Sequence, residues 1–142
     1  MEKFPKTYDV LIIGAGPAGA NAAISYKNLN PSLTVGLVDK AIFPRDKSCG
    51  DAIGPGVISA LKRFNNEHIL DGEPQVVSTT LYGPDNIGIQ NYIPEVKNKE
   101  DSIVYVIPRL DLDNRILNLA KESGVDVYEG YSFVDFNTNE DR

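Results

Sequence analysis

A glycine-rich turn near the N-terminus could bind phosphate groups through backbone atoms alone. Residues Tyr8–Gly19 read YDVLIIGAGPAG, a GxGxxG pattern that directly follows an apolar run. Gly14 permits a tight turn out of a strand, and Gly16 removes a side chain so that a pyrophosphate can approach the backbone. Gly19 lets the next helix pack closely on the strand, and the free N–H groups of that helix then point at the phosphates. The pattern predicts a dinucleotide site.

An acidic residue stands where the second strand of such a site should end. Asp39 follows the apolar run Val35–Val38 and lies twenty positions after Gly19. A carboxylate there accepts hydrogen bonds from ribose hydroxyls and repels a 2′-phosphate, which favours FAD or NAD(H) over NADP(H). The alternative is a glycine-rich turn in an ordinary α/β protein. The flanking strands, the helix and the spaced acid favour the dinucleotide site.

The elements that position this turn alternate between strands and helices. The run Val10–Ile13 is apolar without alternation, which is typical of a strand covered on both faces. A helix is expected from Pro17 to about Leu29, where Asn30–Pro31 ends it. The remaining elements expected for this sheet are a strand over 33–38, a helix over 110–123 ended by Gly124, a parallel strand over 125–128 and a further strand over 131–136. This order predicts an α/β fold with a Rossmann-like sheet.

The middle of the chain interrupts that alternation with short strands. A loop is expected over Ala41–Pro55, followed by a helix over Val57–Phe64. Strands are then expected over 76–82 and 87–93, paired antiparallel around the turn Gly83–Asn86, with a third strand of the same group over 102–107. The charged stretch Lys97–Asp101 is interpreted as a solvated connection. Residues 76–107 therefore form an inserted antiparallel segment.

Composition excludes several classes of protein. The chain has 142 residues, 42% of them hydrophobic, and a net charge of −6, so a core is expected and a sequence-independent nucleic-acid binder is not. Cys49 is the only cysteine, which excludes an internal disulfide, and no metal site is expected. The single histidine, His68, is expected to face solvent. Because no segment has about 20 consecutive apolar residues, we expect a cytoplasmic protein, either soluble or peripheral to a membrane.

The loop that follows Asp39 carries a second set of residues suited to chemistry. It reads KAIFPRDKSCGDAIGPG, and Lys47–Asp51 within it matches a K-x-C-G-[DG] segment. With GAGPAG upstream, the loop resembles the geranylgeranyl reductase family of FAD-dependent oxidoreductases, of the archaeal digeranylgeranylglycerophospholipid reductase type. Arg109–Ile116 is similar to a later R-x-x-[FL]-D-x-x-[LI] segment of that family, and Leu81–Asp85 is similar to a strand and turn of archaeal members. The resemblance spans almost the whole chain.

The resemblance implies FAD as the cofactor and a hydroxylase-type flavoprotein fold. The chain, residues 1–142, would be a single, partial N-terminal FAD-binding domain with its inserted strands at 76–107. The residues that the family would place around the cofactor are Gly14, Gly16, Pro17, Ala18 and Gly19 at the pyrophosphate, Asp39 and Lys40 at the ribose, Cys49, Gly50, Asp51 and Ala52 at the flavin end, and Arg109 at the start of a helix. Cys49 is also the candidate catalytic residue.

Each of these assignments has a structural alternative. Cys49 could be a small buried apolar residue, as free cysteines usually are. Arg109 could pair with Asp113, four residues later on a helix surface. Asp51 could serve only to form a turn. The charges of Arg45 and Lys47 are interpreted by default as solvated loop charges.

The resemblance also implies an activity. Enzymes of this family saturate isolated double bonds of prenyl chains: reduced flavin delivers a hydride to one carbon and a proton reaches the other. The implied partners are a prenyl lipid or prenylated pigment, an external electron donor such as NAD(P)H or ferredoxin, and a membrane surface. Two alternatives stay open, a flavin-dependent monooxygenase or halogenase and a non-catalytic nucleotide-binding module.

The chain also departs from the family pattern. A complete family member is much longer and carries a Gly-Asp motif late in its chain, whereas Gly50–Asp51 here lies in the wrong place for that motif. We therefore expect a fragment, a truncated gene product or one partner of a split protein, with weak FAD binding.

Overall fold

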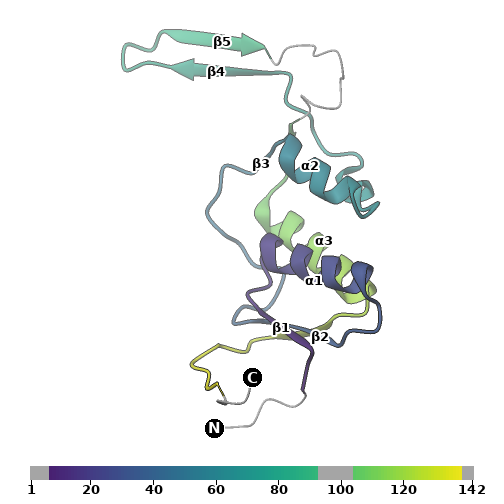
Figure 1. Cartoon of the computed structure of the whole chain (residues 1–142). Helices are drawn as coiled ribbons and strands as arrows, with labels where there is room; N and C mark the ends of the chain where they lie inside the picture. Colours follow the sequence, from purple (N-terminus) through teal and green to yellow (C-terminus); the bar gives the residue numbers. More distant parts are fainter. Residues whose placement is uncertain (1–6, 93–103, 139–142) are drawn as a thin grey trace. The chain divides into compact units, whose positions relative to one another are not determined.

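The computed structural model describes residues 7–92 and 104–138, which fall into two units. Unit 1 contains residues 1–46 and 113–142, and unit 2 contains residues 47–112. Figure 1 shows the elements in chain order. One helix, α3 (Arg109–Glu122), begins in unit 2 and continues in unit 1 from Asp113 onward. Each unit is described by itself.

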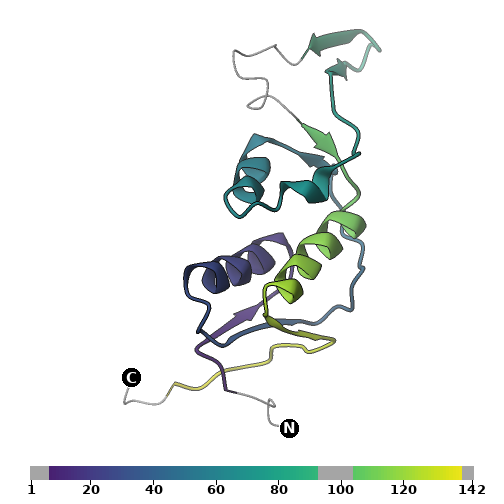
Figure 2. The same cartoon turned by 90° about the vertical axis from the view of Figure 1, so that its right-hand side faces the viewer.

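Unit 1 is built on a parallel sheet of three strands in the order β1-β2-β7. Val10 pairs with Val35 and Gly36 pairs with Asp126, so the second strand along the chain lies in the middle of the sheet. Helix α1 connects the first two strands, and Figures 1 and 2 show α1 and α3 side by side over the same face. The elements are β1 (Val10–Ile13), α1 (Pro17–Leu29), β2 (Val35–Asp39) and β7 (Asp126–Glu129). The predicted α/β fold is confirmed.

Helix α1 packs through small residues, and helix α3 packs through a longer stripe of larger apolar residues. Ala20, Ala23 and Ile24 are buried on α1 at the i, i+3, i+4 spacing of one helix face. On α3 the corresponding stripe is made of Ile116, Leu117 and Ala120, each fully buried, with Leu119 and Leu112 nearly so. Figures 1 and 2 show both helices over the sheet, and the first four residues of its central strand, β2, are all buried. Non-polar burial in this layer stabilises unit 1.

The prediction that β1 is covered on both faces is wrong for the described residues. Leu11 is 46% exposed and Ile13 is 51% exposed, while their neighbours along the strand are half-buried. The reason is position in the sheet: β1 is an edge strand, and both helices lie on one face. A continuous apolar run therefore does not distinguish an edge strand covered on one face from a central strand.

The strand predicted over residues 131–136 is also absent from the structure. The segment after β7 is held at its start, because the Gly130 N–H donates to the carbonyl of Ala41 at 3.2 Å and the Tyr131 N–H donates to that of Asp39 at 2.9 Å. Beyond these bonds β2 has ended and offers no further ladder partner. Alternation of apolar residues cannot form a strand without a neighbouring edge.

Unit 2 contains two separate antiparallel strand pairs. The hairpin β4 (Ser78–Tyr82) and β5 (Gly88–Tyr92) confirms the pairing predicted around residues 83–86, with Ser78 opposite Tyr92. The other pair joins β3 (Ala52–Ile53) to β6 (Tyr105–Val106). Two helices complete the unit, α2 (Pro55–Lys62) and the short 3-10 helix η1 (Glu67–Leu70), which carries the exposed His68.

The prediction that the third strand of the inserted segment joins the hairpin is wrong. One edge of β6 pairs with β3, and β3 itself lies within the stretch predicted to be a loop. The other edge of β6 lies against residues 74–76: the Val106 N–H donates to the Pro74 carbonyl at 3.1 Å, and the Val76 N–H donates to the Val104 carbonyl at 2.8 Å. Because a strand has only two edges, β6 has none left for β4 or β5. The charged stretch 97–101 lies outside the described residues.

The helices of the described residues are short. Helix α1 has 13 residues and α3 has 14, and no helix in these ranges is long and apolar enough to cross a membrane. The predicted localisation stays a prediction.

Candidate cofactor site

The glycine turn of unit 1 leads directly from β1 into α1. Gly14 adopts a φ of +101°, a conformation that side chains rarely tolerate, and its N–H donates to the Val38 carbonyl at 2.7 Å. Gly16 then caps α1 with an extended backbone and offers no side-chain hydrogen bond to the first turn of the helix. Pro17 stands at the first helical position, where its missing N–H costs nothing. The predicted tight turn is confirmed, and the N-terminus of α1 is left uncapped by side chains.

Gly19 is required by packing rather than by backbone conformation. A Cβ built on Gly19 would lie 1.8 Å from the carbonyl oxygen of Gly14, well inside atomic contact. Its nearest side-chain neighbour would be Ile12, at 3.4 Å. The predicted close packing of helix on strand is therefore confirmed.

The carboxylate of Asp39 ties the end of β2 to the glycine turn. Its Oδ2 accepts the Ala15 N–H at 2.7 Å, and its Oδ1 accepts the Ala41 N–H at 2.8 Å. A carboxylate oxygen has two lone pairs, so each oxygen can accept another donor, such as a ribose hydroxyl. Asp39 is half-buried and Lys40 beside it is exposed. The position predicted for ribose binding thus also braces the turn that would bind phosphate.

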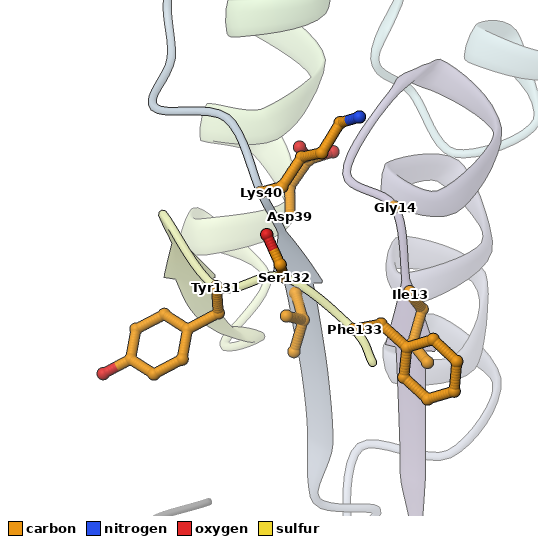
Figure 3. Close-up of a pocket in the computed structure, with 8 residues that line it drawn as sticks. Ile13, Gly14, Asp39, Lys40, Tyr131, Ser132 and Phe133 are labelled. Carbon is orange, nitrogen blue, oxygen red and sulfur yellow. The ribbon is translucent and has the colours of Figure 1, made fainter. Parts of the chain in front are cut away.

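A pocket of about 240 Å³ opens beside Asp39 in unit 1. Figure 3 shows the hydroxyl of Ser132 on the side of Asp39 and Lys40, and the ring of Tyr131 pointing away. The volume is below the roughly 300–1,000 Å³ of sites for whole drug-sized ligands, so the pocket suits one part of a dinucleotide. It is lined by Ile13, Gly14, Val38, Asp39, Lys40, Tyr131, Ser132 and Phe133.

An ion pair beside the glycine turn was not predicted from the sequence. Nη2 of Arg45 lies 3.2 Å from Oδ2 of Asp113, whose side chain is fully buried. The guanidinium also stacks over the Phe43 ring, 4.9 Å from its centroid. The default interpretation of Arg45 as a solvated loop charge is wrong. The available signal was the position of Asp113 on the buried stripe of α3, three residues before Ile116, where a charge requires a partner.

The loop that carries Arg45 is anchored through Glu129 at the end of β7. Oε2 of Glu129 accepts the Phe43 N–H at 2.6 Å, and Oε1 contacts the Lys121 ammonium at 2.8 Å. Burial by itself would raise the pKa of the Glu129 carboxyl, but the hydrogen bonds from Lys121 and from the Phe43 N–H outweigh it and lower that pKa. Glu129 therefore stays ionised and fixes Phe43, the ring under Arg45.

Unit 2 brings three of the predicted flavin-end residues together. The thiol of Cys49 is exposed, and its pKa is lowered first by a hydrogen bond from the Asp51 N–H and then by one from the Arg109 side chain. Asp51 has a φ of +55°, and its Oδ1 accepts the Arg109 N–H at 3.2 Å. The alternative of a buried apolar Cys49 is wrong. The positive φ of Asp51 is compatible with the turn-forming alternative, and the same residue also contacts Cys49 through its N–H.

The other residues assigned by resemblance lie as follows. Pro17 and Ala18 form the first turn of α1, Gly50 has open space where a Cβ would stand, and Ala52 is exposed in β3. Their contacts with a cofactor stay predictions. Among residues 7–92 and 104–138, no group of three or more His, Cys, Asp or Glu side chains could hold a metal ion.

Comparison with known proteins supports a flavoprotein. No family model matches the chain. A menaquinone reductase of Mycolicibacterium smegmatis is 33% identical over 127 residues, which are 89% of this chain and 30% of that protein. A digeranylgeranylglycerophospholipid reductase of Picrophilus torridus is 30% identical over 123 residues, 85% of this chain and 29% of the relative. The chain is homologous to FAD-dependent oxidoreductases.

The fold is also similar to that of a solved FAD-dependent enzyme. The solved structure of a myxobacterial FAD-dependent chondrochloren halogenase matches 97% of this chain and 32% of its own, with a TM-score of 0.77 and 23% identity. The Rossmann-type fold predicted from the sequence is thereby confirmed, and the comparisons bear out FAD as the expected cofactor. The chain spans about three tenths of the length of the relatives that it matches.

The residues present in unit 1 fit the dinucleotide part of FAD. Gly16 leaves a bare cradle at the uncapped N-terminus of α1, where an anion is stabilised by free N–H groups and the helix dipole. Asp39 offers spare lone pairs beside a pocket of suitable size.

Proposed function

We propose that this chain forms the FAD-binding portion of an enzyme that reduces double bonds in the prenyl chains of lipids or pigments. Its similarity to a digeranylgeranylglycerophospholipid reductase supports this substrate class. The Lys47–Asp51 segment, which carries the polarised Cys49 thiol, is the single structural feature on which the proposal chiefly rests. An external donor, NAD(P)H or ferredoxin, would reduce the cofactor.

The residues of unit 1 would hold the cofactor by its nucleotide end. Asp39 would accept hydrogen bonds from the adenosine ribose, with Lys40 beside it, and the adenosine would occupy the pocket next to them. Gly14, Gly16 and the first turn of α1, with Pro17, Ala18 and Gly19, would surround the pyrophosphate. Once reduced by the external donor, the bound cofactor would supply the hydride for the alkene.

The Cys49 cluster of unit 2 would serve the reacting end. Because the Asp51 N–H and Arg109 both favour the thiolate, a larger fraction of Cys49 is ionised near neutral pH than for a free thiol. A thiol of lowered pKa is the stronger acid, so the protonated form of Cys49 would give the Sγ proton that alkene reduction requires at the second carbon, and the thiolate would then be reprotonated from solvent. Gly50 and Ala52 would leave room for the flavin beside it.

Replacement of the thiol tests this role. In the protein that contains this chain, Cys49→Ser should slow alkene-dependent reoxidation of the reduced flavin more than it lowers FAD affinity. Serine keeps the approximate size but not the acidity. Stopped-flow reoxidation would be measured beside a melting curve. Unchanged reoxidation, or a lowered melting temperature with normal turnover per folded protein, would remove Cys49 from the site.

The same assay distinguishes the alternatives. A flavin-dependent halogenase or monooxygenase stays open because a halogenase shares this fold. Such an enzyme would consume oxygen and halogenate or hydroxylate an added substrate, whereas a prenyl reductase would reoxidise anaerobically with a prenyl lipid. Absence of any flavin binding would favour a non-catalytic nucleotide-binding module.

A further inference from the structure

We propose that Arg45 binds a phosphate of the dinucleotide at Gly16 and that the buried Asp113 positions it. The inference rests on the proposed nucleotide site and adds two residues that neither the motif nor the resemblance assigns. All of the residues concerned belong to unit 1.

The guanidinium of Arg45 lies at the bare face of the glycine turn. A Cβ built on Gly16 would lie 3.4 Å from Nη2 of Arg45, and no other heavy atom of the described residues, its chain neighbours apart, would come within 4 Å. Gly16 is also the N-cap of α1, so the space in front of it faces the free N–H groups of the first turn. A phosphate placed there would meet backbone donors on one side and a guanidinium on the other.

Asp113 fixes the direction in which Arg45 presents its charge. The Asp113 side chain is fully buried, whereas that of Arg45 is 20% exposed, so the cation is the solvent-facing member of the pair. A guanidinium has five N–H donors, and the 3.2 Å contact with Asp113 leaves others available for phosphate oxygens. The Phe43 ring supports the guanidinium plane from below. Such a pre-oriented arginine loses little side-chain entropy when it binds an anion.

The pair could instead be an internal tie between the 41–46 loop and α3. Breaking a buried ion pair is destabilising in any case, so a fall in stability alone cannot distinguish the two roles. The phosphate dependence of binding can. If Arg45 binds phosphate, its replacement should weaken the binding of ADP and FAD but not that of adenosine, which lacks phosphate. If the pair only ties the loop to α3, its loss should affect the affinities for all three ligands alike.

The test measures the affinities of three ligands by titration, with binding monitored through the NMR chemical shifts of backbone amides. Adenosine, ADP and FAD would be titrated into the wild type, Arg45→Met, Arg45→Lys and Asp113→Asn. We expect Arg45→Met to weaken ADP and FAD about tenfold to a hundredfold, the range for hydrogen bonds to charged groups. Adenosine affinity should change less than about twofold. Lys27→Met is the matched control, because it removes a cation of unit 1 whose ammonium donates to the Pro31 and Leu33 carbonyls, at the end of α1 opposite to Gly16.

Asp113→Asn should produce the same selective loss through Arg45. Combined with Arg45→Met, it should add little further loss for ADP, because the residue that it positions is already gone. Arg45→Lys retains a positive charge beside Asp113, so it should stay folded and allow the test if the methionine variant unfolds. It too should lose ADP affinity relative to adenosine, because an ammonium lacks the planar fork.

Two failures are distinguishable. If the wild type binds neither ADP nor FAD, the proposed nucleotide site is wrong and the inference falls with it. If the wild type binds ADP and the ratio of ADP to adenosine affinity is the same in the Arg45 and Asp113 variants, only the inference is wrong. Lowered melting temperatures with that ratio unchanged would identify the pair as an internal tie.

Discussion

The glycine turn of unit 1 and the Cys49 cluster of unit 2 are held in place by different kinds of constraint. Around the turn, backbone atoms pack so closely that single atoms decide which residue fits, as at Gly19. In the Cys49 cluster an exposed sulfur is held by a backbone N–H and one long side chain, and a Cβ added at Gly50 beside it would meet open space. Steric constraint thus defines the proposed nucleotide end, and electrostatic constraint defines the proposed reactive end.

The largest expected effect breaks the steric side of this comparison. Gly19→Ala places a Cβ 1.8 Å from the Gly14 carbonyl oxygen, so α1 must move away from β1. We expect a loss of at least about 1–3 kcal/mol in the free energy of unfolding and loss of FAD binding. Urea unfolding followed by far-UV circular dichroism measures it.

The matched control for Gly19 is in unit 2. Gly50→Ala adds the same methyl group where no heavy atom lies within 4 Å, and the stability should not change. Equal urea midpoints for the two variants would show that helix-to-strand packing at Gly19 is looser than the structure indicates.

The next effect concerns the brace between β2 and the turn. Asp39→Ala removes the acceptor of the Ala15 and Ala41 N–H groups and the proposed ribose ligand. FAD binding should weaken by about 1–3 kcal/mol, measured by calorimetric titration.

Asp9 provides a control for Asp39 on the same sheet. Its carboxylate accepts the N–H and hydroxyl of Thr34 at the opposite end of β1 and β2. Asp9→Ala should therefore leave FAD affinity unchanged. If both variants bind FAD equally well, Asp39 is only a brace.

The smallest expected effect concerns the pKa of the Cys49 thiol, and it tests the electrostatic constraint in unit 2. The Asp51 N–H and Arg109 lower the pKa of the Cys49 thiol, so alkylation by iodoacetamide should persist to lower pH than for a free thiol, because only the thiolate reacts. Arg109→Gln should move the midpoint of the pH–rate profile upward, though not to that of a free thiol, since the Asp51 N–H remains. An unmoved midpoint would mean that Arg109 does not act on the sulfur.

The sequence predicted the steric features well because they follow from local spacing. The turn, α1, the parallel order of β1 and β2 and the 78–92 hairpin all depend on residues close in the chain. The partner of β6, by contrast, depends on which edge competes for it, and no local pattern encodes that choice. The exposure of Leu11 and Ile13 likewise depends on what covers β1.

The ion pair of Arg45 with Asp113 shows the same limit at the site. The two residues lie 68 positions apart, so neither loop composition nor helix periodicity connects them. The sequence offered Arg109, one turn earlier, as one possible partner of Asp113. A charged residue on a buried helix stripe predicts that a partner exists, but the identity of that partner comes only from the fold.

The central claim is that the glycine turn of unit 1 binds FAD through its backbone, and a titration of FAD into the wild type and Gly16→Val tests it most directly. Gly16 has a φ of −65°, which valine tolerates, and a Cβ there would lie 3.4 Å from its nearest neighbour, Nη2 of Arg45, so the variant should fold. The wild type should show saturable quenching of flavin fluorescence that ADP reverses. Gly16→Val should show neither, at an unchanged melting temperature, because its side chain fills the space of the pyrophosphate. Equal FAD affinity in the two proteins would contradict the account.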